Sequence, residues 1–336
     1  MSQPLLPERM TEIVITKPGG PEVLEPRIVS VPWPDRGELL VRVEAAGVNR
    51  PDVIQRMGQY PVPPDANPTP GLEIAGEVVA IGDGVGGFAV GDAVCGLANG
   101  GGYAEYCLLP AGQTLPRPRG VGSIQAAAIP ETFFTVWANL FGIGRAIKGD
   151  HVLIHGGTSG IGTTALMLCQ EFGIRAFATA GSEQKCTAIR ELGGDAINYR
   201  ERDFAEEVLE RTEGRGVDVI LDIMGGSYFD RNIAALARGG RLVVIGFLGG
   251  TIAEQLDLQA LALKRAVVTG STMRARTAAE KAEIADDLRA KVWPILSAGR
   301  CLPIVHEVFP FSRAADAHRV MEAGDHIGKI VLAVPD

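Results

Sequence analysis

The residues best suited to chemistry form a glycine cluster in the middle of the chain. His151–His155 is a short, mostly apolar run, and the seven residues after it, Gly156 to Gly162, include four glycines. This order predicts a buried strand, a tight turn and a helix over Thr163–Phe172. Backbone N–H groups at a helix N-terminus attract anions, and side chains in the turn would keep a pyrophosphate away from them. The stretch therefore predicts a dinucleotide site.

The spacing of the glycines departs from G-x-G-x-x-G, because Ser159 occupies a position where glycine is common. The context supports the assignment, since Arg175–Ala180 reads as a second strand and completes a βαβ unit. A glycine-rich turn without a ligand is the alternative. The residues expected to lie against the cofactor in this turn are Gly157, Ser159, Gly160, Ile161 and Gly162.

Strands and helices alternate on both sides of this cluster. Helices are expected at 163–172, 183–192, 203–212 and 227–236, and strands at 151–155, 175–180, 196–199, 217–224, 240–247 and 266–272. Such alternation predicts an α/β domain with a doubly wound, parallel, six-stranded sheet over residues 134–273. The strand at 266–272 would form the edge of the sheet. An exposed edge favours pairing with a second subunit, so a homodimer is expected.

The N-terminal third has a different pattern, with short strands separated by proline and glycine. The expected strands are Thr11–Thr16, Leu39–Glu44, Glu73–Ile81, Ala93–Cys95 and Ala104–Leu109. Their even spacing predicts a β-rich, barrel-like domain. Asn49–Pro70 is read as a long loop with six prolines, which is typical of a functional or disordered segment.

The helical period first appears at Gln125–Asn139, where the chain is expected to enter the nucleotide-binding half. The last 60 residues are expected to return to the first domain. They read as a helix, a strand, a helix and a strand, at Ala278–Ser297, Ile304–Phe309, Ala314–Ala323 and Lys329–Val334. The predicted domains are therefore 1–133 with 274–336, and 134–273, with residues 1–9 as an extension.

The composition limits the possible functions. The net charge of −8 over 336 residues argues against a surface that binds a nucleic-acid backbone. Five dispersed cysteines without a C-x-x-C motif favour neither a disulfide framework nor a cysteine zinc cluster. No signal peptide and no membrane-spanning run can be read, so a cytoplasmic protein is expected. The five histidines form no cluster with a serine or cysteine nucleophile, which disfavours a catalytic triad.

Several windows together resemble a known family, the zinc-independent quinone oxidoreductases of the medium-chain dehydrogenase/reductase superfamily. The resemblance covers nearly the whole chain, and the windows are Gly47–Asp52, Gly71–Glu73, Ala126–Glu131, 151–162, Asn198–Tyr199 and Ile327–Ile330. The most similar branch is that of the p53-inducible quinone oxidoreductase, through Asn49–Tyr60, Thr179–Ser182 and Ile223–Tyr228. The resemblance implies a GroES-like β-rich catalytic domain beside a Rossmann domain.

The same comparison argues against a metal. Zinc alcohol dehydrogenases of this superfamily place a cysteine directly after a Gly-Val pair and a histidine in Gly-His-Glu. This chain has Asn49 and Leu72 at those positions. Neither side chain can replace a thiolate or imidazole ligand of tetrahedral zinc, so no metal site is expected.

The expected cofactor is NADPH. NAD sites usually carry an acidic residue at the end of the second strand, whereas here the strand ends at Gly181 and Ser182 with Lys185 one helical turn later. In the resembled family the residues matching Ser182, Lys185 and Tyr199 contact the 2′-phosphate. A solvated helix-face cation is the alternative for Lys185. Glu183 would repel a phosphate unless its carboxylate points away.

Three residues near the proline-rich segment are candidates for the catalytic site. Asn49 can donate its amide to a ligand or satisfy its own turn. Asp52 orients a neighbour or caps a helix that starts near Val53, and the sequence does not separate the two. Tyr60 can stack on an aromatic acceptor, donate to a developing oxyanion, or cover the core.

Further cofactor contacts are expected from other parts of the chain. Thr135 resembles the residue that binds the nicotinamide amide, and an internally bonded helix threonine is its alternative. The segment after strand 240–247 lies where cofactors bind in open α/β sheets, and the C-terminal segment is expected to close the site. The residues concerned are Gly246, Phe247, Leu248, Gly328 and Lys329.

The function expected from these features is NADPH-dependent, metal-free reduction of a quinone. Reduction of an activated C=C bond, in a 2-alkenal, enone or enoyl thioester, uses the same hydride geometry and stays open as an alternative. A non-enzymatic alternative is an NADPH-binding sensor or a crystallin-like RNA-binding protein, although the net charge disfavours the RNA version.

Overall fold

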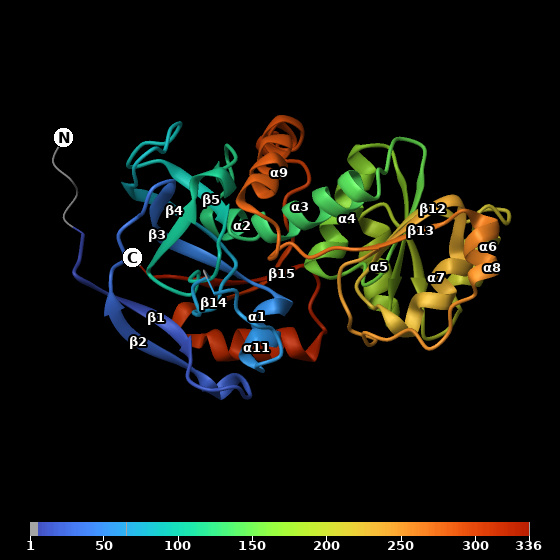
Figure 1. Ribbon diagram of the computed structural model, residues 1–336, viewed down its shortest axis with the longest axis horizontal. Helices are drawn as coiled ribbons and strands as arrows, with labels where there is room; N and C mark the ends of the chain where they lie inside the picture. The colour runs from blue at the N-terminus through green and yellow to red at the C-terminus, as the bar shows by residue number, and fades with distance from the viewer. Residues whose placement is uncertain (1–5, 65, 336) are drawn as a thin grey trace. The chain divides into compact units, whose positions relative to one another are not determined.

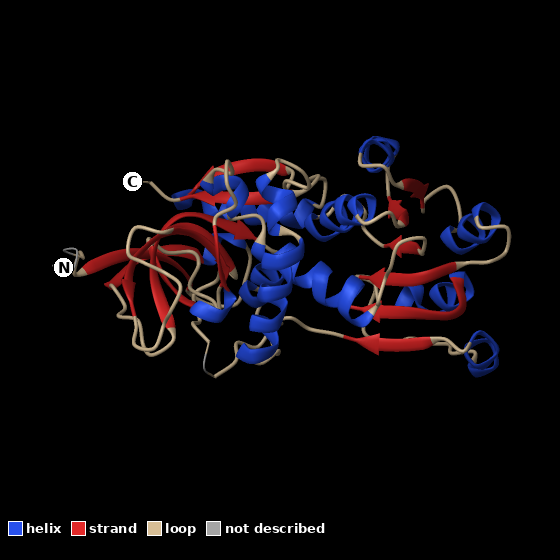
Figure 2. Ribbon diagram, turned by 90° about the horizontal axis from the view of Figure 1, so that it is seen from above, coloured by secondary structure: helices blue, strands red, loops and turns tan. Residues whose placement is uncertain are grey.

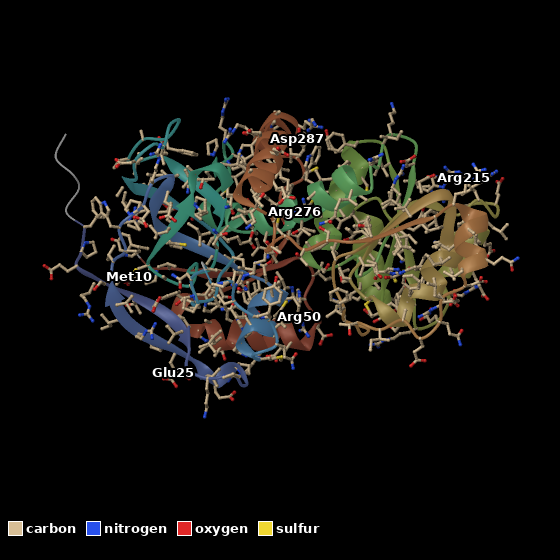
Figure 3. All side chains as sticks on the ribbon, viewed as in Figure 1. Met10, Glu25, Arg50, Arg215, Arg276 and Asp287 are labelled. Atoms are coloured by element: carbon tan, nitrogen blue, oxygen red, sulfur yellow. The ribbon has the colours of Figure 1, made fainter. Side chains whose placement is uncertain are left out.

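The computed structural model describes residues 6–64 and 66–335. The chain forms two compact units, one made of residues up to Phe134 together with those from Arg274, the other of Thr135–Met273 (Figure 1). They are called the β-rich unit and the Rossmann unit below. Residues 1–5 of the expected N-terminal extension lie outside the described residues. Charged side chains such as Glu25, Arg215 and Asp287 project from the two units into solvent (Figure 3).

A seven-stranded sheet organises the β-rich unit, in the order β14-β15-β3-β4-β5-β7 with β6 also paired to β3. Its strands are β3 (Glu38–Val48), β4 (Glu73–Ile81), β5 (Ala93–Leu97), β6 (Tyr106–Pro110), β7 (Thr114–Pro116), β14 (Val305–Pro310) and β15 (Lys329–Ala333). Strand β3 is central, because it pairs antiparallel with β4, β6 and β15. A separate antiparallel pair is formed by β1 (Arg9–Ile15) and β2 (Leu24–Ser30).

The β-rich unit contains helices, and the one at Ala314–Ala323 has the bounds that the sequence predicts. They are α1 (Arg50–Arg56), α2 (Ser123–Ala126), α9 (Ala278–Lys291), α10 (Trp293–Ser297) and α11 (Ala314–Ala323). The expected loop at 49–70 was wrong in its first part, because α1 lies there with proline in its first turn, where the missing N–H costs no helical hydrogen bond. The helix expected over 278–297 is two helices, because Pro294 cannot continue the hydrogen-bond ladder.

The Rossmann unit confirms the expected α/β fold. Its six strands are all parallel, in the order β10-β9-β8-β11-β12-β13. They are β8 (His151–Ile154), β9 (Arg175–Ala180), β10 (Asp195–Asn198), β11 (Val217–Asp222), β12 (Leu236–Val244) and β13 (Val267–Gly270). Strand β8 stands between β9 and β11, so the turn after it opens where the strand order reverses. Ligands of such sheets bind at this position.

Helices lie on both sides of the parallel strands (Figure 2). They are α4 (Gly160–Glu171), α5 (Glu183–Glu191), α6 (Phe204–Arg211), α7 (Phe229–Ala235) and α8 (Leu258–Lys264). Helix α4 begins three residues before the expected Thr163, because Ser159 caps it. The boundary between the units falls within α3 (Pro130–Val136), which continues into a π-helical segment, Trp137–Ile143. Among the described residues, no helix is long and apolar enough to cross a membrane.

Candidate active site

The first residues of interest lie where β3 ends and α1 begins. Asn49 is the N-cap of α1, and its backbone N–H donates to Asp52 Oδ2 at 2.9 Å. Asp52 Oδ1 accepts from the Gly71 N–H, also at 2.9 Å. Asp52 is fully buried, and burial raises its pKa to about 6 although the two N–H donors act in the opposite direction. Asp52 therefore fixes the helix start against the segment at Gly71, which matches the capping alternative.

The Asn49 side chain is held by a buried ion pair. Its Nδ2 donates to Glu73 Oε1 at 2.9 Å, and its Oδ1 accepts from the Lys329 ammonium. Lys329 also forms a 2.7 Å ion pair with Glu73 and donates to the Val48 carbonyl at 3.1 Å. The side chains of Lys329 and Glu73 are 4% and 0% exposed. Each of the two buried charges is thus paired with the other, and a buried charge without a partner would strongly destabilise the fold.

Glu131 lies beside this ion pair, and the sequence gives it no role. Its backbone N–H donates to the free oxygen of Glu73, Oε2, at 2.8 Å. Its own side chain makes no hydrogen bond or ion pair with the residues that the structure describes. Burial, with the nearby Glu73 carboxylate next in effect, raises the Glu131 pKa to about 8, and Lys329 opposes the rise. The carboxyl therefore keeps its proton near neutral pH.

Tyr60 packs against a cation. The Arg274 guanidinium carbon lies 5.1 Å from the centroid of the Tyr60 ring, and Arg274 Nη1 donates to Gln55 Oε1 at 2.8 Å. Burial raises the Tyr60 pKa, the Arg274 charge lowers it, and Glu131 and Asp52 add smaller increases. The phenol therefore shares one electrostatic neighbourhood with Glu131 and Asp52. It remains protonated at neutral pH and can donate a hydrogen bond.

A second buried polar cluster joins α1 to α11. Arg56 is 0% exposed and forms a 2.8 Å ion pair with Glu322, and its Nη1 lies 3.3 Å from His318 Nδ1. Because arginine can only donate, Nδ1 accepts, and His318 Nε2–H donates to the Tyr103 hydroxyl at 3.1 Å. Burial and Arg56 lower the His318 pKa to about 3. A histidine held neutral in this way is structural, and it stabilises the helix that presents Asp52.

In the Rossmann unit, Ser159 holds the glycine turn after β8 in place. Ser159 Oγ accepts from the Gly162 N–H at 3.0 Å and donates to the Gly156 carbonyl at 2.8 Å. A Cβ on residue 162 would lie 2.3 Å from that carbonyl oxygen. The turn therefore requires glycine at 162. Gly160 and Ile161 form the first turn of α4, with their N–H groups at its positive end.

A hydrogen-bond chain of fixed direction supports this turn. The Gly156 N–H donates to Thr179 Oγ1 at 3.2 Å, and His155 Nδ1 lies 3.1 Å from the same hydroxyl. Asn232 Nδ2 donates to Asp222 Oδ2 at 3.2 Å, so Asn232 Oδ1 must accept from His155 Nε2–H at 2.7 Å. Neutral His155 therefore accepts at Nδ1 from Thr179. Burial lowers the His155 pKa to about 4, which preserves this arrangement.

Residues expected near a 2′-phosphate gather at the end of β9. Ser182 is the N-cap of α5 and accepts from the Lys185 N–H at 3.4 Å. A Cβ on Gly181 would lie 2.6 Å from the Tyr199 hydroxyl and 3.3 Å from Arg200 Nε, so these groups adjoin the strand end. Arg200 is a further cation that the sequence does not single out. The Glu183 carboxylate forms a 2.6 Å ion pair with Arg190, and both side chains are exposed.

Thr135 has an unsatisfied hydroxyl. Its Oγ1 is buried and has no hydrogen-bond partner among the described residues, whereas its backbone carbonyl accepts from Asn139 Nδ2 at 2.8 Å. An internally bonded helix threonine would donate to a carbonyl one turn earlier, so that alternative is wrong. A buried donor without a partner costs about 1–3 kcal/mol, and a ligand amide would remove that cost. The hydroxyl and the glycine turn both fit a nicotinamide dinucleotide.

The remaining expected residues fall into two groups. Gly246, Phe247 and Leu248 follow β12 at the carboxyl edge of the sheet, and the last two are each 54% exposed. Gly328 has a φ of +86°, and a Cβ there would lie 2.2 Å from the Ile304 carbonyl, so the backbone requires glycine. Lys329 has three protein acceptors, and its expected contact with a cofactor stays a prediction.

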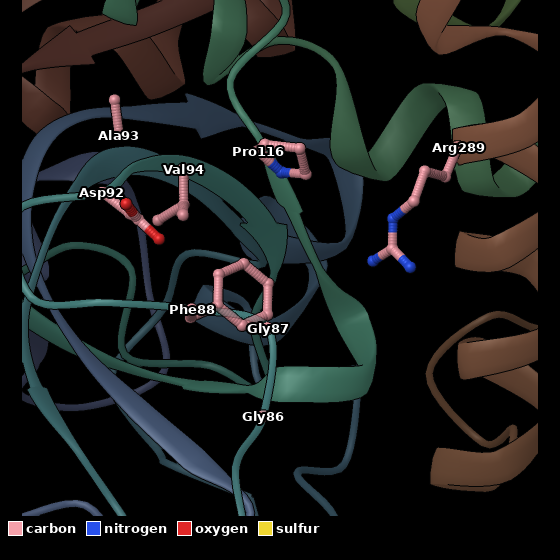
Figure 4. A pocket seen from close by; sticks show the side chains of 8 residues that line it. All are labelled: Gly86, Gly87, Phe88, Asp92, Ala93, Val94, Pro116 and Arg289. Atoms are coloured by element: carbon pink, nitrogen blue, oxygen red, sulfur yellow. The ribbon is translucent and has the colours of Figure 1, made fainter.

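A cavity elsewhere in the β-rich unit contains none of the expected site residues. It has a volume of about 430 Å³ and is lined by glycines and proline around Phe88, Asp92 and Arg289 (Figure 4). Within residues 6–64 and 66–335, no group of three or more His, Cys, Asp and Glu side chains is arranged to hold a metal ion.

Comparison with known proteins identifies the family. An alcohol dehydrogenase GroES-like domain matches residues 35–119, and a zinc-binding dehydrogenase domain matches residues 192–332. The quinone oxidoreductase of Rattus norvegicus is 31% identical over 327 residues, which span 96% of this chain and 97% of that protein. The chain belongs to the quinone oxidoreductase family of the medium-chain dehydrogenase/reductase superfamily.

Solved structures of similar proteins agree with this family. A mycobacterial protein in complex with NADPH matches with a TM-score of 0.84 and 32% identity, over 96% of this chain and 99% of that one. The CurK enoyl reductase matches with a TM-score of 0.84 and 27% identity, over 98% and 100% of the two chains. The protein of this chain is therefore an oxidoreductase of the superfamily.

Proposed function

We propose that this oxidoreductase reduces quinones with NADPH and uses no metal ion. The observation that carries the proposal is the buried cluster of Asn49, Glu73 and Lys329, which already contains its own cation. Asn49 and Leu72 stand where zinc alcohol dehydrogenases of the superfamily have cysteine and histidine. A zinc ion needs such ligands. It would also meet the Lys329 ammonium beside Glu73.

NADPH is the proposed cofactor. Its pyrophosphate would be held by the N–H groups of Gly160 and Ile161, in the turn that Ser159 shapes by accepting from the Gly162 N–H. The 2′-phosphate would be held near the end of β9 by Ser182, Lys185 and Tyr199, with Arg200 as an added cation. The ion pair between Glu183 and Arg190 supports this choice, because the Arg190 charge offsets that of the carboxylate next to Ser182.

In the proposed reaction the protein mainly positions the cofactor and the acceptor. The bound nicotinamide supplies a hydride, and negative charge then develops on an acceptor oxygen. The Thr135 hydroxyl would orient the nicotinamide amide. Tyr60 would bind the acceptor ring by stacking and donate a hydrogen bond to the developing charge, while Arg274 holds the Tyr60 ring in place.

The proposal is tested by steady-state rates on an ortho-quinone with NADPH and with NADH, together with the zinc content of the active protein. Turnover at least tenfold more efficient with NADPH, at well under one zinc per chain, is the expected result. Stoichiometric zinc whose removal abolishes the rate would contradict the metal-free mechanism.

Reduction of activated C=C bonds is the second candidate function, and its support is the structural match to the CurK enoyl reductase. Rates on a 2-alkenal and on the ortho-quinone, measured side by side, decide between the two. A sensor or RNA-binding role without catalysis predicts NADPH binding with turnover of neither acceptor.

We also propose a homodimer that pairs through β13. This strand is the edge of the parallel sheet, and Val267 and Val268 on it are 51% and 39% exposed. Exposed edge strands with apolar side chains readily pair with a second chain. Sedimentation should give a dimer, and Val268→Asp should give monomers. A monomeric wild-type protein at micromolar concentration would contradict the proposal.

A further inference from the structure

The guanidinium of Arg274, in the β-rich unit, has hydrogen-bonding capacity that the protein does not use. Its Nη1 donates to Gln55 Oε1 at 2.8 Å, and its central carbon lies over the Tyr60 ring, 5.1 Å from the ring centroid. Its Nε and Nη2 are buried and have no acceptor among the described residues. Only one of the three nitrogens therefore has a protein partner.

The two unused nitrogens belong to the same edge of the guanidinium. The N–H of Nε and one N–H of Nη2 are held nearly parallel by the planar group, and this fork matches the two oxygens of a carboxylate. Gln55 is bonded to the third nitrogen, and its own Nε2 donates to the Pro68 carbonyl at 2.8 Å. The protein thus fixes the guanidinium and leaves the edge that binds a two-oxygen anion without an acceptor.

The charge of Arg274 also lacks a counter-ion. Within residues 6–64 and 66–335, no carboxylate forms an ion pair with it, whereas the nearby Arg276 pairs with Glu280 at 3.9 Å. A buried donor without a partner is unfavourable, and more so when the donor is charged. An anionic ligand would supply both the missing acceptors and the missing charge.

This edge lies beside the residue proposed to bind the acceptor ring, Tyr60. Both Arg274 and Tyr60 are partly exposed. Arg274 lies in a turn, and residues 57–64, which include Tyr60, form neither a helix nor a strand. A ligand can therefore enter between these side chains without breaking a regular element.

We propose that the Nε–H and Nη2–H edge of Arg274 binds an anionic two-oxygen group, such as a carboxylate, that the acceptor carries. The inference rests on the proposed reduction of quinones, in which Tyr60 stacks on the acceptor ring. The preferred acceptors are then aromatic quinones with an acidic substituent. Stacking on Tyr60 and two parallel hydrogen bonds from Arg274 hold them.

The test measures the binding of two probes that differ in one group, 2-naphthoate and the neutral 2-naphthamide, by calorimetry in the presence of NADPH. The wild-type protein should bind 2-naphthoate at least tenfold more tightly, because a hydrogen bond to a charged group contributes a factor of about ten or more to Kd. Arg274→Met should abolish this preference and leave the Kd for NADPH unchanged. Arg274→Lys keeps the charge but not the fork, so it should retain only part of the preference.

A matched control and a rate measurement complete the test. Arg289→Met removes an exposed guanidinium elsewhere in the β-rich unit and should bind both probes as the wild type does. In initial-rate assays, Arg274→Met should raise the KM for an ortho-quinone with a ring carboxylate at least tenfold. Its KM for the same quinone without the carboxylate should stay within threefold of wild type.

Three results would overturn the inference. The first is a wild-type protein that binds the two probes equally, and the second is an Arg274→Met variant that keeps the preference for 2-naphthoate. The third is a loss of NADPH affinity in Arg274→Met as large as the loss for 2-naphthoate, which would assign this edge to a cofactor phosphate. A protein that prefers 2-naphthoate but reduces no quinone refutes the proposed function and not the anion site, so the two failures are distinguishable.

Discussion

Replacement of Lys329 by methionine should destabilise the β-rich unit strongly. The substitution keeps a long unbranched side chain but leaves the fully buried Glu73 carboxylate without its ion partner and Asn49 Oδ1 without its donor. Loss of one partner of a buried ion pair costs about 3–5 kcal/mol. A unit of about 200 residues loses about 2–4 °C per kcal/mol, so calorimetry should show its transition lowered by ~10 °C.

Two further variants control this result. Lys291→Met breaks an exposed 2.7 Å pair with Asp287 on α9, and such pairs contribute about 0.2–1 kcal/mol. Lys329→Met combined with Glu73→Gln removes both buried charges and should recover more than half of the loss. Two results would refute the idea that Lys329 neutralises the buried Glu73 carboxylate. One is a Lys329→Met variant that loses no more stability than Lys291→Met, and the other is a double variant that is less stable than Lys329→Met alone.

Three other substitutions test the Rossmann unit. Lys185→Ala should raise the KM for NADPH at least tenfold more than that for NADH in initial-rate assays, and equal effects would exclude contact with the 2′-phosphate. Gly162→Ala should weaken NADPH binding at least tenfold by calorimetry, since its Cβ would lie 2.3 Å from the Gly156 carbonyl oxygen; unchanged binding would show that the turn is not the phosphate site. For His155, the unfolded chain takes up a proton near its ordinary pKa, whereas the folded chain does so only near pH 4. As the pH falls from 6.5 to 4, the wild-type free energy of unfolding should therefore decrease by about 1.4 kcal/mol per pH unit because of His155, and the His155→Leu variant should lack this decrease. Urea midpoints that change with pH in the same way for both proteins would contradict this.

The fold of the Rossmann unit could be predicted because its signals are local. The strand at 175–180 and the turn after β8 follow from a few adjacent residues whose types fix backbone conformation. The strand at 73–81 in the β-rich unit was predicted for the same reason. The alternation of strands and helices predicts a doubly wound, parallel, six-stranded sheet, and the structure adds the order of its strands.

Other elements carry too little local signal. Strand β2 is mostly exposed and contains proline, so its residues do not alternate between apolar and polar. Strand β7 has three residues. Helix α1 starts at Arg50 and not near Val53 as the sequence suggests, because Pro51 reads as a helix breaker although a proline is tolerated in the first turn. In each case, pairing or packing with distant residues decides the structure.

The same limit applies to the candidate site. Asn49 and Asp52 are neighbours in sequence, and their capping geometry can be expected from the helix start. Glu73 lies 24 residues from Asn49, and Lys329 lies 280 residues from it. No spacing rule predicts that contact, and the sequence assigns Lys329 to the cofactor. Glu131 stands in a family window, but its protonation state depends on charges that come from four other elements.

The charge balance around Glu73 has a consequence for how an acceptor can be reduced. A metal ion can stabilise an oxyanion because it carries charge that its ligands do not cancel. The Lys329 ammonium is neutralised by Glu73 at 2.7 Å and is 4% exposed, so it offers an acceptor little net charge. A neutral hydrogen-bond donor such as Tyr60 reduces the cost of a developing oxyanion but does not remove its charge.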